Sequence, residues 1–565
     1  MTDAEKNDQF YRDTESIAFP KLDDRQLALL EPIGQRRTVR QGECIFRAGQ
    51  RELGMTVILS GEIEIYETRD GLEQILATSG PRDFVGDIAM LNGTSALFSA
   101  RGKAEQSDVL EVSASHLRKA LAELPGLGEP VVSALIMRRE RLQRDPEYAG
   151  LRVVTLNGAR EGHLLHDFLD KNHVPHRVIT AESPDGMLLC ERLNLNARDL
   201  PALISATGIP LRRPSLREAA QIAGLLRPLA REQDDQILCD IAVVGAGPAG
   251  LAAAVNAASE GLHTIVLESY ASGGQAGSSS LIENFFGFPT GISGGELTYR
   301  AQLQAYRFGA KFSTPAQALS LSFVEGEYGA KLQIEGYHAA LLAKCVIIAT
   351  GAEYRRIDAE GREDFEGSGV YYAATALEGQ ICAGSTIIVA GGGNSAGQAA
   401  MFLSESAAQV FLVIRGTDLC KSMSSYLALR VQAQKNIEIL RHTEIRRMMG
   451  GKRLEAVELE DMDTRERRIV STAAVFSMIG AKPCTHWLPK EIETDEKGFI
   501  KTGPAIAHAA AWQNLSRAPG ALETSRPGVF AAGDVRSGSV KRCAAAVGEG
   551  GMAVEGIHNA LGTYA

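Results

Sequence analysis

Two short glycine turns have the residue spacing in this chain that most strongly indicates chemistry. The first turn, Gly245-Ala246-Gly247-Pro248-Ala249-Gly250, directly follows the apolar run 241–244. In such a turn the first glycine permits a tight bend, the second lets the backbone approach a pyrophosphate, and the third lets helix and strand pack closely. The next helix would offer free N–H groups to the phosphates. The spacing predicts a dinucleotide site formed by Gly245, Gly247, Pro248, Ala249 and Gly250, with a simple packing turn as the alternative.

An acidic residue supports the dinucleotide interpretation of this turn. Glu268 ends the predicted strand 263–267 and lies 23 residues after Gly245. A carboxylate at this place accepts hydrogen bonds from ribose hydroxyls. A turn framed by two strands and an acid is far more specific than glycines alone. A membrane span is the alternative for the uncharged stretch 241–258, but its glycines and proline favour a strand, a turn and a helix.

A second turn follows the strand predicted at 386–390. Its predicted binding residues are Gly391, Gly393, Asn394, Ser395 and Ala396. The next predicted strand, 409–414, ends at Arg415 where many dinucleotide folds have an acid. A guanidinium group there can pair with a 2′-phosphate, which favours NADPH over NADH. A solvated charge at a strand end is the alternative interpretation of Arg415.

The order of these turns, with the second fold inserted into the first, resembles the low-molecular-weight thioredoxin reductases over residues 240–561. Segments 272–275, 283–285, 528–534, 541–542 and 548–550 resemble the family's FAD contacts, while 349–351 and 478–480 resemble its two crossovers between domains. The resemblance implies an FAD-dependent NAD(P)H oxidoreductase and a homodimer. It also implies that FAD binds Gly274, Gln275, Asn284, Thr350, Gly351, Gly533, Asp534, Lys541 and Arg542, with Asp534 on a ribityl hydroxyl.

The chain departs from this family at the redox-active dithiol. The family's C-A-T-C motif corresponds here to the segment 373–376, and both cysteine positions are alanine, Ala373 and Ala376. Alanine has no thiol and cannot take part in disulfide exchange. We therefore expect electrons to pass from reduced flavin directly to an external acceptor, either a quinone or a small redox protein. A redox or ligand sensor with little turnover is one alternative. A disulfide reductase that uses other cysteines, such as Cys382 or Cys543, is another.

The N-terminal region has the pattern of a β-barrel or jelly roll. Short apolar runs at 44–46, 55–59, 63–66 and 74–77 alternate with glycine turns. Residues 42–63 resemble a cyclic-nucleotide-binding domain, with Asp87 at the position of a ribose-binding glutamate. Ser95-Ala96 replaces the Pro-Arg pair that binds the cyclic phosphate, so a charge-assisted contact is lost. We expect a docking or degenerate sensor module, although Arg101 could hold a nucleotide-like ligand if the loop register differs.

Residues from Leu151 onward resemble a thioredoxin or glutaredoxin fold in the order strand, helix, strand, helix, hairpin and helix. The position of the active-site C-x-x-C holds Gly158-Ala159-Arg160-Glu161, and Pro201 stands where that fold has a cis-proline. Without thiols this region is expected to be a docking surface or a spacer. Four histidines lie in this region: His163, His166, His173 and His176. A metal site is the alternative interpretation, although no cysteines or paired acids accompany them.

Composition and charge limit the partners. The net charge of −10, from 59 basic and 69 acidic residues, argues against a nucleic-acid partner. Eight scattered cysteines and a polar N-terminus predict a reduced, cytoplasmic protein without a membrane span. The predicted fold class is multidomain: a jelly roll, a small thioredoxin-like α/β domain and two Rossmann-like folds. The predicted bounds are 1–145, 151–230, 236–352 with 481–565 for FAD, and 353–480 for NAD(P)H.

Overall fold

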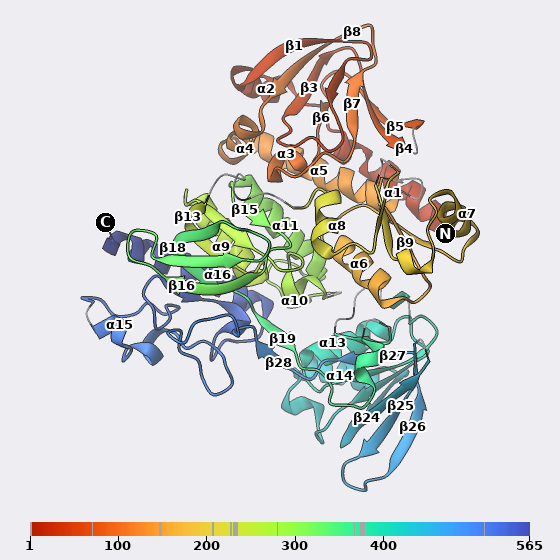
Figure 1. Cartoon of the computed structure of the whole chain (residues 1–565), viewed down its shortest axis with the longest axis vertical. Coiled ribbons are helices and arrows are strands. Elements are labelled where there is room, and N and C mark those ends of the chain that lie inside the picture. Colours follow the sequence, from red (N-terminus) through yellow and green to blue (C-terminus); the bar gives the residue numbers. More distant parts are fainter. Residues whose placement is uncertain are drawn as a thin grey trace.

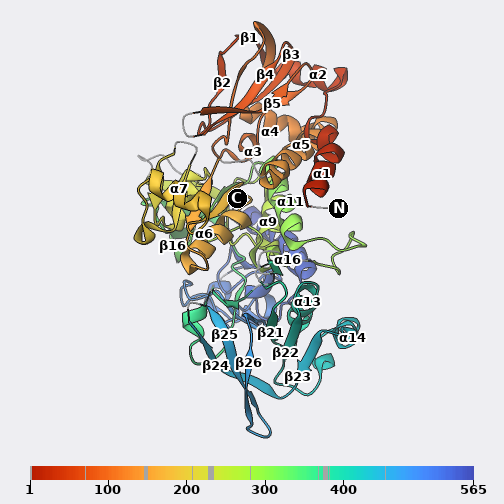
Figure 2. The same ribbon diagram turned by 90° about the vertical axis from the view of Figure 1, so that its right-hand side faces the viewer.

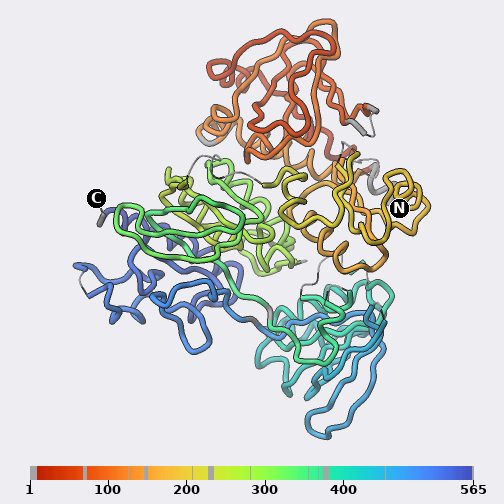
Figure 3. The backbone as a smooth tube through the Cα atoms, viewed as in Figure 1, coloured from red at the N-terminus to blue at the C-terminus, as the bar shows by residue number. Residues whose placement is uncertain are grey.

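The computed structural model describes the chain apart from residues 1–2, 70–71, 146–149, 206–207, 227–228, 230–234, 280, 367, 373, 375–378, 381, 452, 514 and 565. Four groups of elements follow one another along the chain (Figures 1 and 3). We call them the N-terminal unit, the middle unit, the outer dinucleotide fold and the inner dinucleotide fold.

The N-terminal unit is a jelly roll of two four-stranded sheets, ordered β1-β8-β3-β6 and β2-β7-β4-β5. Its core forms where alternate side chains of both sheets meet, among them Val57, Ile63 and Phe84. Two helices precede the sheets, one lies within them, and two follow. The elements are α1 (Asp3–Ala18), α2 (Asp24–Leu30), β1 (Gly34–Arg40), β2 (Cys44–Phe46), β3 (Met55–Ser60), β4 (Ile63–Arg69), β5 (Leu72–Ser79), β6 (Phe84–Val85), α3 (Ala89–Asn92), β7 (Ser99–Gly102), β8 (Gln106–Val112), α4 (Ala114–Glu123) and α5 (Pro125–Arg144).

The middle unit is a four-stranded sheet, ordered β10-β9-β11-β12, in which β9 and β10 are parallel and β11 and β12 form an antiparallel hairpin. The Leu200–Pro201 peptide bond is cis, as predicted for Pro201. Ser215 and Glu218 form the predicted capping box at the start of the last helix. The elements are β9 (Arg152–Thr155), α6 (Arg160–Lys171), β10 (Arg177–Thr180), α7 (Pro184–Arg192), β11 (Ala202–Ile204), β12 (Pro210–Arg212) and α8 (Leu216–Ile222).

The outer dinucleotide fold has a seven-stranded sheet in which β15, β14, β13, β18 and β29 run parallel and β17 and β16 complete an antiparallel edge. Helices α9 and α16 pack against each other on this sheet. The elements are β13 (Gln236–Val244), α9 (Pro248–Ser259), β14 (Thr264–Leu267), α10 (Gly274–Gly277), α11 (Gly294–Arg307), β15 (Lys311–Ser313), β16 (Ala318–Phe323), β17 (Ala330–Ile334), β18 (Ala340–Ile348), α15 (Ala510–Gln513), β29 (Val529–Ala531) and α16 (Cys543–Tyr564).

The inner dinucleotide fold is inserted between β18 and β29. Its parallel sheet has the order β20-β27-β21-β22-β23, and an antiparallel sheet β24-β25-β26 covers it. The chain enters through β19 (Ala352–Tyr354) and leaves through β28 (Ala481–Pro483), which pair with each other. The elements are β20 (Val370–Tyr371), β21 (Thr386–Ala390), α13 (Asn394–Leu403), β22 (Gln409–Val413), α14 (Ser425–Ala433), β23 (Ile437–Leu440), β24 (Thr443–Gly450), β25 (Leu454–Asp461), β26 (Arg467–Ser471) and β27 (Ala474–Ser477).

The helix-rich ends of the N-terminal unit were the least predictable part. Helix α1 lies in a polar segment for which no helix was predicted, and it packs on α5 through Arg141, which donates to the carbonyl oxygen of Tyr11. Helix α5 begins five residues before the predicted start at Pro130. Within the described residues no single helix is long and apolar enough to cross a membrane; α4 and α5 reach that length and hydropathy only as a bent pair.

Candidate functional site

The first glycine turn connects strand β13 to helix α9 and forms one side of the candidate site in the outer dinucleotide fold. Gly245 has a φ of +102°, which a side chain would disfavour. A Cβ on Gly250 would lie 1.9 Å from the carbonyl oxygen of Gly245, so only glycine allows this packing. By contrast, a Cβ on Gly247 would meet nothing closer than the Cα of Gly274, at 4.0 Å. The open space beside Gly247 at the N-terminus of α9 suits a pyrophosphate group.

Glu268 lies at the end of β14 and is turned toward this turn. Its Oε2 accepts the N–H of Ala246 at 2.8 Å, and its Oε1 accepts the N–H of Tyr270 at 2.9 Å. Burial raises the pKa of the Glu268 carboxyl above its usual range, while these N–H groups act in the opposite direction. The carboxylate is therefore fixed beside the glycine turn, at the edge where a ribose would lie.

Residues 272–279, 281–284 and 350–352 border the site on the side of the inner fold. Gln275 donates its side-chain N–H to the carbonyl oxygen of Ala352, which ties α10 to the crossover strand β19. Thr350 Oγ1 donates to the carbonyl oxygen of Cys484 at 2.9 Å, next to the returning crossover. Asn284 is exposed. Its neighbour Glu283 pairs with Arg430 of α14 at 2.9 Å, so the two dinucleotide folds also touch through this loop.

The segment from Gly533 to Glu549 forms the opposite border. The pKa of the Asp534 carboxyl is raised, mainly because it is buried. Lys541 donates to the carbonyl oxygen of Asp534 and lies 4.3 Å from the ring centre of Phe499. Arg542 is exposed and follows in the same loop. A carboxyl group at this border could accept hydrogen bonds from a hydroxyl-rich ligand.

Glu549 holds this segment in place. Its Oε2 accepts the N–H of Gly533 at 2.7 Å, and its two oxygens accept two N–H groups of Arg536 at 3.2 and 2.5 Å. The Glu549 side chain is only 12% exposed, so the paired charges are shielded from water. The resemblance placed Glu549 in the FAD-contact segment 548–550, but its pairing with Arg536, 13 residues away, leaves no local pattern and was not predicted.

The second glycine turn repeats the geometry of the first. Gly391 has a φ of +139°, and a Cβ there would lie 2.2 Å from the carbonyl oxygen of Met478. Gly393 begins α13, and a Cβ there would meet only the carbonyl oxygen of Ser422, at 3.8 Å. Asn394 Oδ1 accepts the N–H of Ser424 at 2.7 Å. Ser395 is exposed at the turn and Ala396 is buried beneath it.

Two features of the inner fold fit a nicotinamide dinucleotide. Among the described residues the buried Oγ of Ser424 has no hydrogen-bond partner, as expected of an atom reserved for a ligand. Arg415 is 71% exposed and its nearest acid is Glu444, at 4.0 Å. Because this contact is weak, the guanidinium group at the strand end is available to an anion.

Within the described residues no disulfide joins any of the eight cysteines. Ala373 and Ala376 lie outside the described residues. Cys382 is buried in the apolar core of the inner fold, where it packs as a small hydrophobic side chain. Cys543 is the first residue of α16, and burial raises the pKa of its thiol to about 11. Neither side chain is placed as a reactive thiolate.

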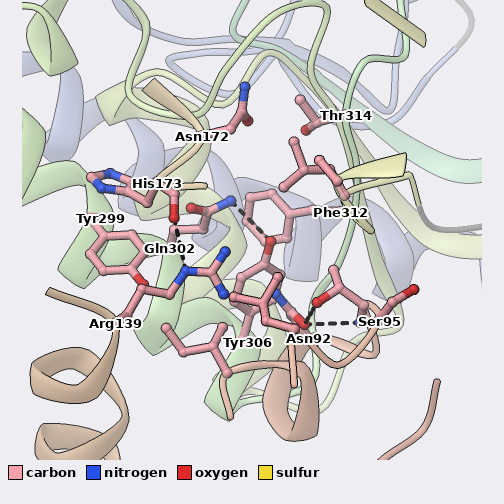
Figure 4. A pocket seen from close by; sticks show the side chains of 15 residues that line it. Asn92, Ser95, Arg139, Asn172, His173, Tyr299, Gln302, Tyr306, Phe312 and Thr314 are labelled. Atoms are coloured by element: carbon pink, nitrogen blue, oxygen red, sulfur yellow. Dashed lines mark hydrogen bonds between the residues drawn. The ribbon is translucent and has the colours of Figure 1, made fainter. Parts of the chain in front are cut away.

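The N-terminal unit uses its predicted nucleotide-binding segment for contacts with the other units (Figure 4). Asp87 lies 3.5 Å from Arg139 of α5 instead of facing an open pocket. The backbone N–H of Ser95 donates to the carbonyl oxygen of Gly224 in the middle unit, at 3.4 Å. Arg101 is held outside the barrel by Glu64 and Glu73, at 3.2 and 2.6 Å. The alternative that Arg101 anchors a cyclic phosphate stays a prediction, and such a ligand would have to compete with both carboxylates for the guanidinium group.

A small cavity of about 40 Å³ lies where the N-terminal unit, the middle unit and the outer fold meet. Arg139 donates to the carbonyl oxygen of His173 at 2.8 Å, and the His173 ring stacks on Tyr299 with centroids 3.9 Å apart. The buried hydroxyls of Tyr299 and Thr314 have no hydrogen-bond partner among the described residues. The volume and these polar atoms suit a few water molecules and are too small for a nucleotide.

Two regions of the chain match known protein families. Residues 239–550 match the pyridine nucleotide-disulphide oxidoreductase family model, and residues 36–123 match the cyclic nucleotide-binding domain model. The thioredoxin reductase of Treponema pallidum is 33% identical over 324 residues, which cover 57% of this chain and 97% of the relative. The crystal structure of Lactococcus lactis thioredoxin reductase has a TM-score of 0.51 at 26% identity and covers 57% of this chain and 99% of its own. A 34.2 kDa protein of the rubredoxin operon of Clostridium pasteurianum is 32% identical and covers 56% of this chain and 94% of the relative.

Proposed function

The chain belongs to the pyridine nucleotide-disulphide oxidoreductase family, and we propose that it is an FAD-dependent enzyme that oxidises NAD(P)H and passes the electrons directly to an external acceptor. It resembles thioredoxin reductases in architecture. The acceptor we propose is a quinone or a small redox protein, and the proposed form is a cytoplasmic homodimer.

The residues of the outer fold suit FAD. The pyrophosphate would lie against the open backbone of Gly247, and Glu268 would accept hydrogen bonds from the adenosine ribose. Asp534, whose backbone carbonyl oxygen accepts a hydrogen bond from Lys541, would bind a ribityl hydroxyl through its carboxyl. A bound flavin would supply the two-electron redox chemistry that amino-acid side chains lack. The chain's own part is to bind the cofactors, orient them and exclude water between them.

The inner fold suits the nicotinamide dinucleotide. Its pyrophosphate would lie at the N-terminus of α13, against Gly393 and within reach of the buried Ser424 hydroxyl. Arg415 is exposed and weakly paired, so it is free to bind a 2′-phosphate. We therefore propose that NADPH is preferred over NADH.

The observation that carries direct transfer to an external acceptor is the pair Ala373 and Ala376. A disulfide reductase stores two electrons in a dithiol before it passes them on, and alanine cannot do this. The raised pKa of Cys543 and the burial of Cys382 argue against substitutes. The electrons must then leave the protein from the flavin itself.

Steady-state kinetics test this proposal. We expect continuous NADPH oxidation with a quinone and none with oxidised thioredoxin as the sole acceptor. Flavin reduction without turnover on any acceptor would instead favour a redox or ligand sensor, in which the N-terminal and middle units respond to the state of the flavin. Thioredoxin reduction at a rate similar to quinone reduction would show that other cysteines replace the missing dithiol.

A further inference from the structure

Helix α11 of the outer fold lies at the junction of that fold with the N-terminal and middle units. Figures 1 and 2 show it next to the helices of the N-terminal unit and beside α9, the helix that follows the first glycine turn. Tyr299, Gln302 and Tyr306 lie three and four residues apart, so they share one face of α11. All three side chains line the small cavity where the units meet (Figure 4).

Both of the other units hold α11 in place. The Tyr299 ring stacks on the ring of His173 in the middle unit, with centroids 3.9 Å apart. The carbonyl oxygen of His173 in turn accepts an N–H of Arg139 from α5 at 2.8 Å. One turn from the end of this face, Arg307 donates to the carbonyl oxygen of Leu121 in α4 at 2.7 Å. The position of α11 therefore depends on contacts with the N-terminal and middle units.

Gln302 connects this face of α11 to the segment predicted to contact FAD. Its Nε2 donates to Ser272 Oγ at 2.8 Å and to the Tyr306 hydroxyl at 2.9 Å. Ser272 is followed by Gly273, whose N–H donates to the carbonyl oxygen of Ala246 in the first glycine turn at 2.8 Å. A side-chain amide of α11 thus supports the residue next to the one that bonds the turn proposed to hold the pyrophosphate.

The middle unit also contacts the outer fold at places away from α11. Asn172 donates to the carbonyl oxygen of Tyr270 at 3.1 Å, and Arg217 of α8 donates to the carbonyl oxygen of Gly336 at 2.9 Å. These hydrogen bonds do not involve Gln302. A change at Gln302 can therefore separate the route through α11 from the other contacts between the two units.

We propose that Gln302 is a positioning residue for the flavin, and that through α11 it makes FAD binding depend on the junction of the three units. This inference rests on the proposed function and adds a means of regulation to its cofactor site. Any change that loosens the junction lets α11 shift and withdraws the support of Ser272. Because the coupling of two binding equilibria is reciprocal, loss of FAD loosens the junction to the same extent.

The rate of FAD release from the full-length holoprotein tests the role of Gln302. Gln302→Leu removes the N–H donor at similar side-chain size, and Ser272→Ala removes the acceptor. Each variant should release FAD about five-fold faster than the unchanged chain. The double variant should release it no faster than the faster single variant, because both changes remove the same hydrogen bond. Gln304→Leu, at an exposed position of the same helix, is the matched control and should leave the rate unchanged.

A second double-mutant cycle tests the dependence on the junction. His173→Asn removes the ring that stacks on Tyr299, and FAD release should become about two- to three-fold faster. In the Gln302→Leu background the same change should have no further effect, because α11 no longer supports Ser272.

Two results would overturn the inference. Equal release rates for Gln302→Leu, Ser272→Ala and Gln304→Leu would show that Gln302 does not position the flavin. An equal effect of His173→Asn with and without Gln302 would show that the junction acts by another route, such as Asn172 and Tyr270. A chain that binds no FAD would refute the proposed function together with this inference. Absence of NADPH oxidation in a chain that retains FAD would refute the proposed function alone, because the release rates do not depend on turnover.

Discussion

The glycines of the first turn shape the site because they have no side chain. Any larger residue would fill the space between α9 and β13. Replacement of Gly250 by alanine would place a Cβ 1.9 Å from the carbonyl oxygen of Gly245, which forces α9 away from β13. We expect Gly250→Ala to lower FAD affinity by at least about ten-fold, or more than about 1.4 kcal/mol. The absorbance of bound flavin relative to protein after gel filtration measures this loss.

The matched control is Gly562→Ala, because a Cβ at Gly562 in α16 meets nothing within 4 Å. This control should retain FAD as the unchanged chain does. Equal flavin content in the two variants would show that the close approach of α9 and β13 does not form the site.

His173 gives the junction of the three units a dependence on pH. Burial, and then the charge of Arg139, lower the pKa of its imidazole to about 4, whereas an unfolded histidine titrates near about 6.5. As the pH falls from about 6.5 to about 4, this histidine takes up a proton in the unfolded chain but not in the folded one. The free energy of unfolding is therefore highest above about pH 6.5 and decreases toward pH 4. The protonation of His173 alone should lower the free energy of unfolding by on the order of 2–3 kcal/mol across this pH window.

His173→Asn should therefore reduce the pH dependence of stability, because asparagine has no group that titrates in this range and tolerates the residue's φ of +53°. Thermal unfolding of the variant and of the unchanged chain at about pH 7 and about pH 5 measures this pH dependence, with His166 unchanged in both proteins. The melting temperature of the variant should fall less on acidification than that of the unchanged chain. An identical fall in both would contradict a buried, neutral His173.

The strand, turn and helix at both glycine turns, and the place of Glu268 after β14, were predicted correctly because they depend on residues close in sequence, while the binding roles stay predictions. Arg139, His173 and Tyr299 could not be predicted as neighbours, because they come from three units separated by long stretches of chain. Segment 548–550 was predicted as an FAD contact, but the bonds from Glu549 to Gly533 and Arg536 were not, for the same reason. These bonds appear only once α16 lies beside the turn at Gly533.

At the scale of elements, α16 matters because it carries the carboxylate that holds the turn at Gly533 and Asp534. Glu549→Ala removes an acceptor of the Gly533 N–H and the partner of Arg536. We expect FAD to bind about ten-fold more weakly in this variant, a change of about 1.4 kcal/mol. Glu549→Gln keeps the acceptor and should lose less.

Recovery of flavin fluorescence on dilution measures the dissociation of FAD from these variants. Glu555→Ala is the matched control, since Glu555 is an exposed acid on the same helix. If Glu549→Ala and Glu555→Ala release FAD equally, Glu549 does not position the turn.

Strands were predicted more accurately than helix ends. The strands 44–46, 152–155 and 386–390 have the predicted bounds, because alternation or a continuous apolar run marks a buried strand clearly. Helix α5 begins at Pro125, a residue favoured in the first turn of a helix, but no apolar periodicity marked that start. Helix α1 is largely polar and its place depends on packing against α5, which no local pattern records.

At the scale of the whole molecule, the N-terminal unit is tied to the rest of the chain by the segment that binds nucleotide in its family. Ser95 contacts Gly224 of the middle unit, while Asp87 pairs within its own unit with Arg139, which in turn donates to the carbonyl oxygen of His173 in the middle unit. A cyclic phosphate would have no arginine partner in this segment and would have to separate the units to enter.

We therefore expect cyclic AMP and cyclic GMP to bind with a dissociation constant above about 1 mM, which corresponds to less than about 4 kcal/mol. Isothermal titration calorimetry on the full-length protein measures this, with NADPH as the positive control. Micromolar binding of either cyclic nucleotide would show that the units separate readily and that the segment still works as a ligand site.

The central claim is that electrons leave this chain from the flavin, without a dithiol. An anaerobic titration of the purified holoprotein with NADPH, and with NADH in parallel, tests it most directly. Each NADPH carries two electrons, and the flavin alone accepts two, so about one equivalent per flavin should bleach it fully. NADPH should act at a lower concentration than NADH, and a quinone should then restore the colour while oxidised thioredoxin does not. Uptake of about two equivalents, or recovery of the colour with thioredoxin, would show that a second redox centre takes part and would contradict the account.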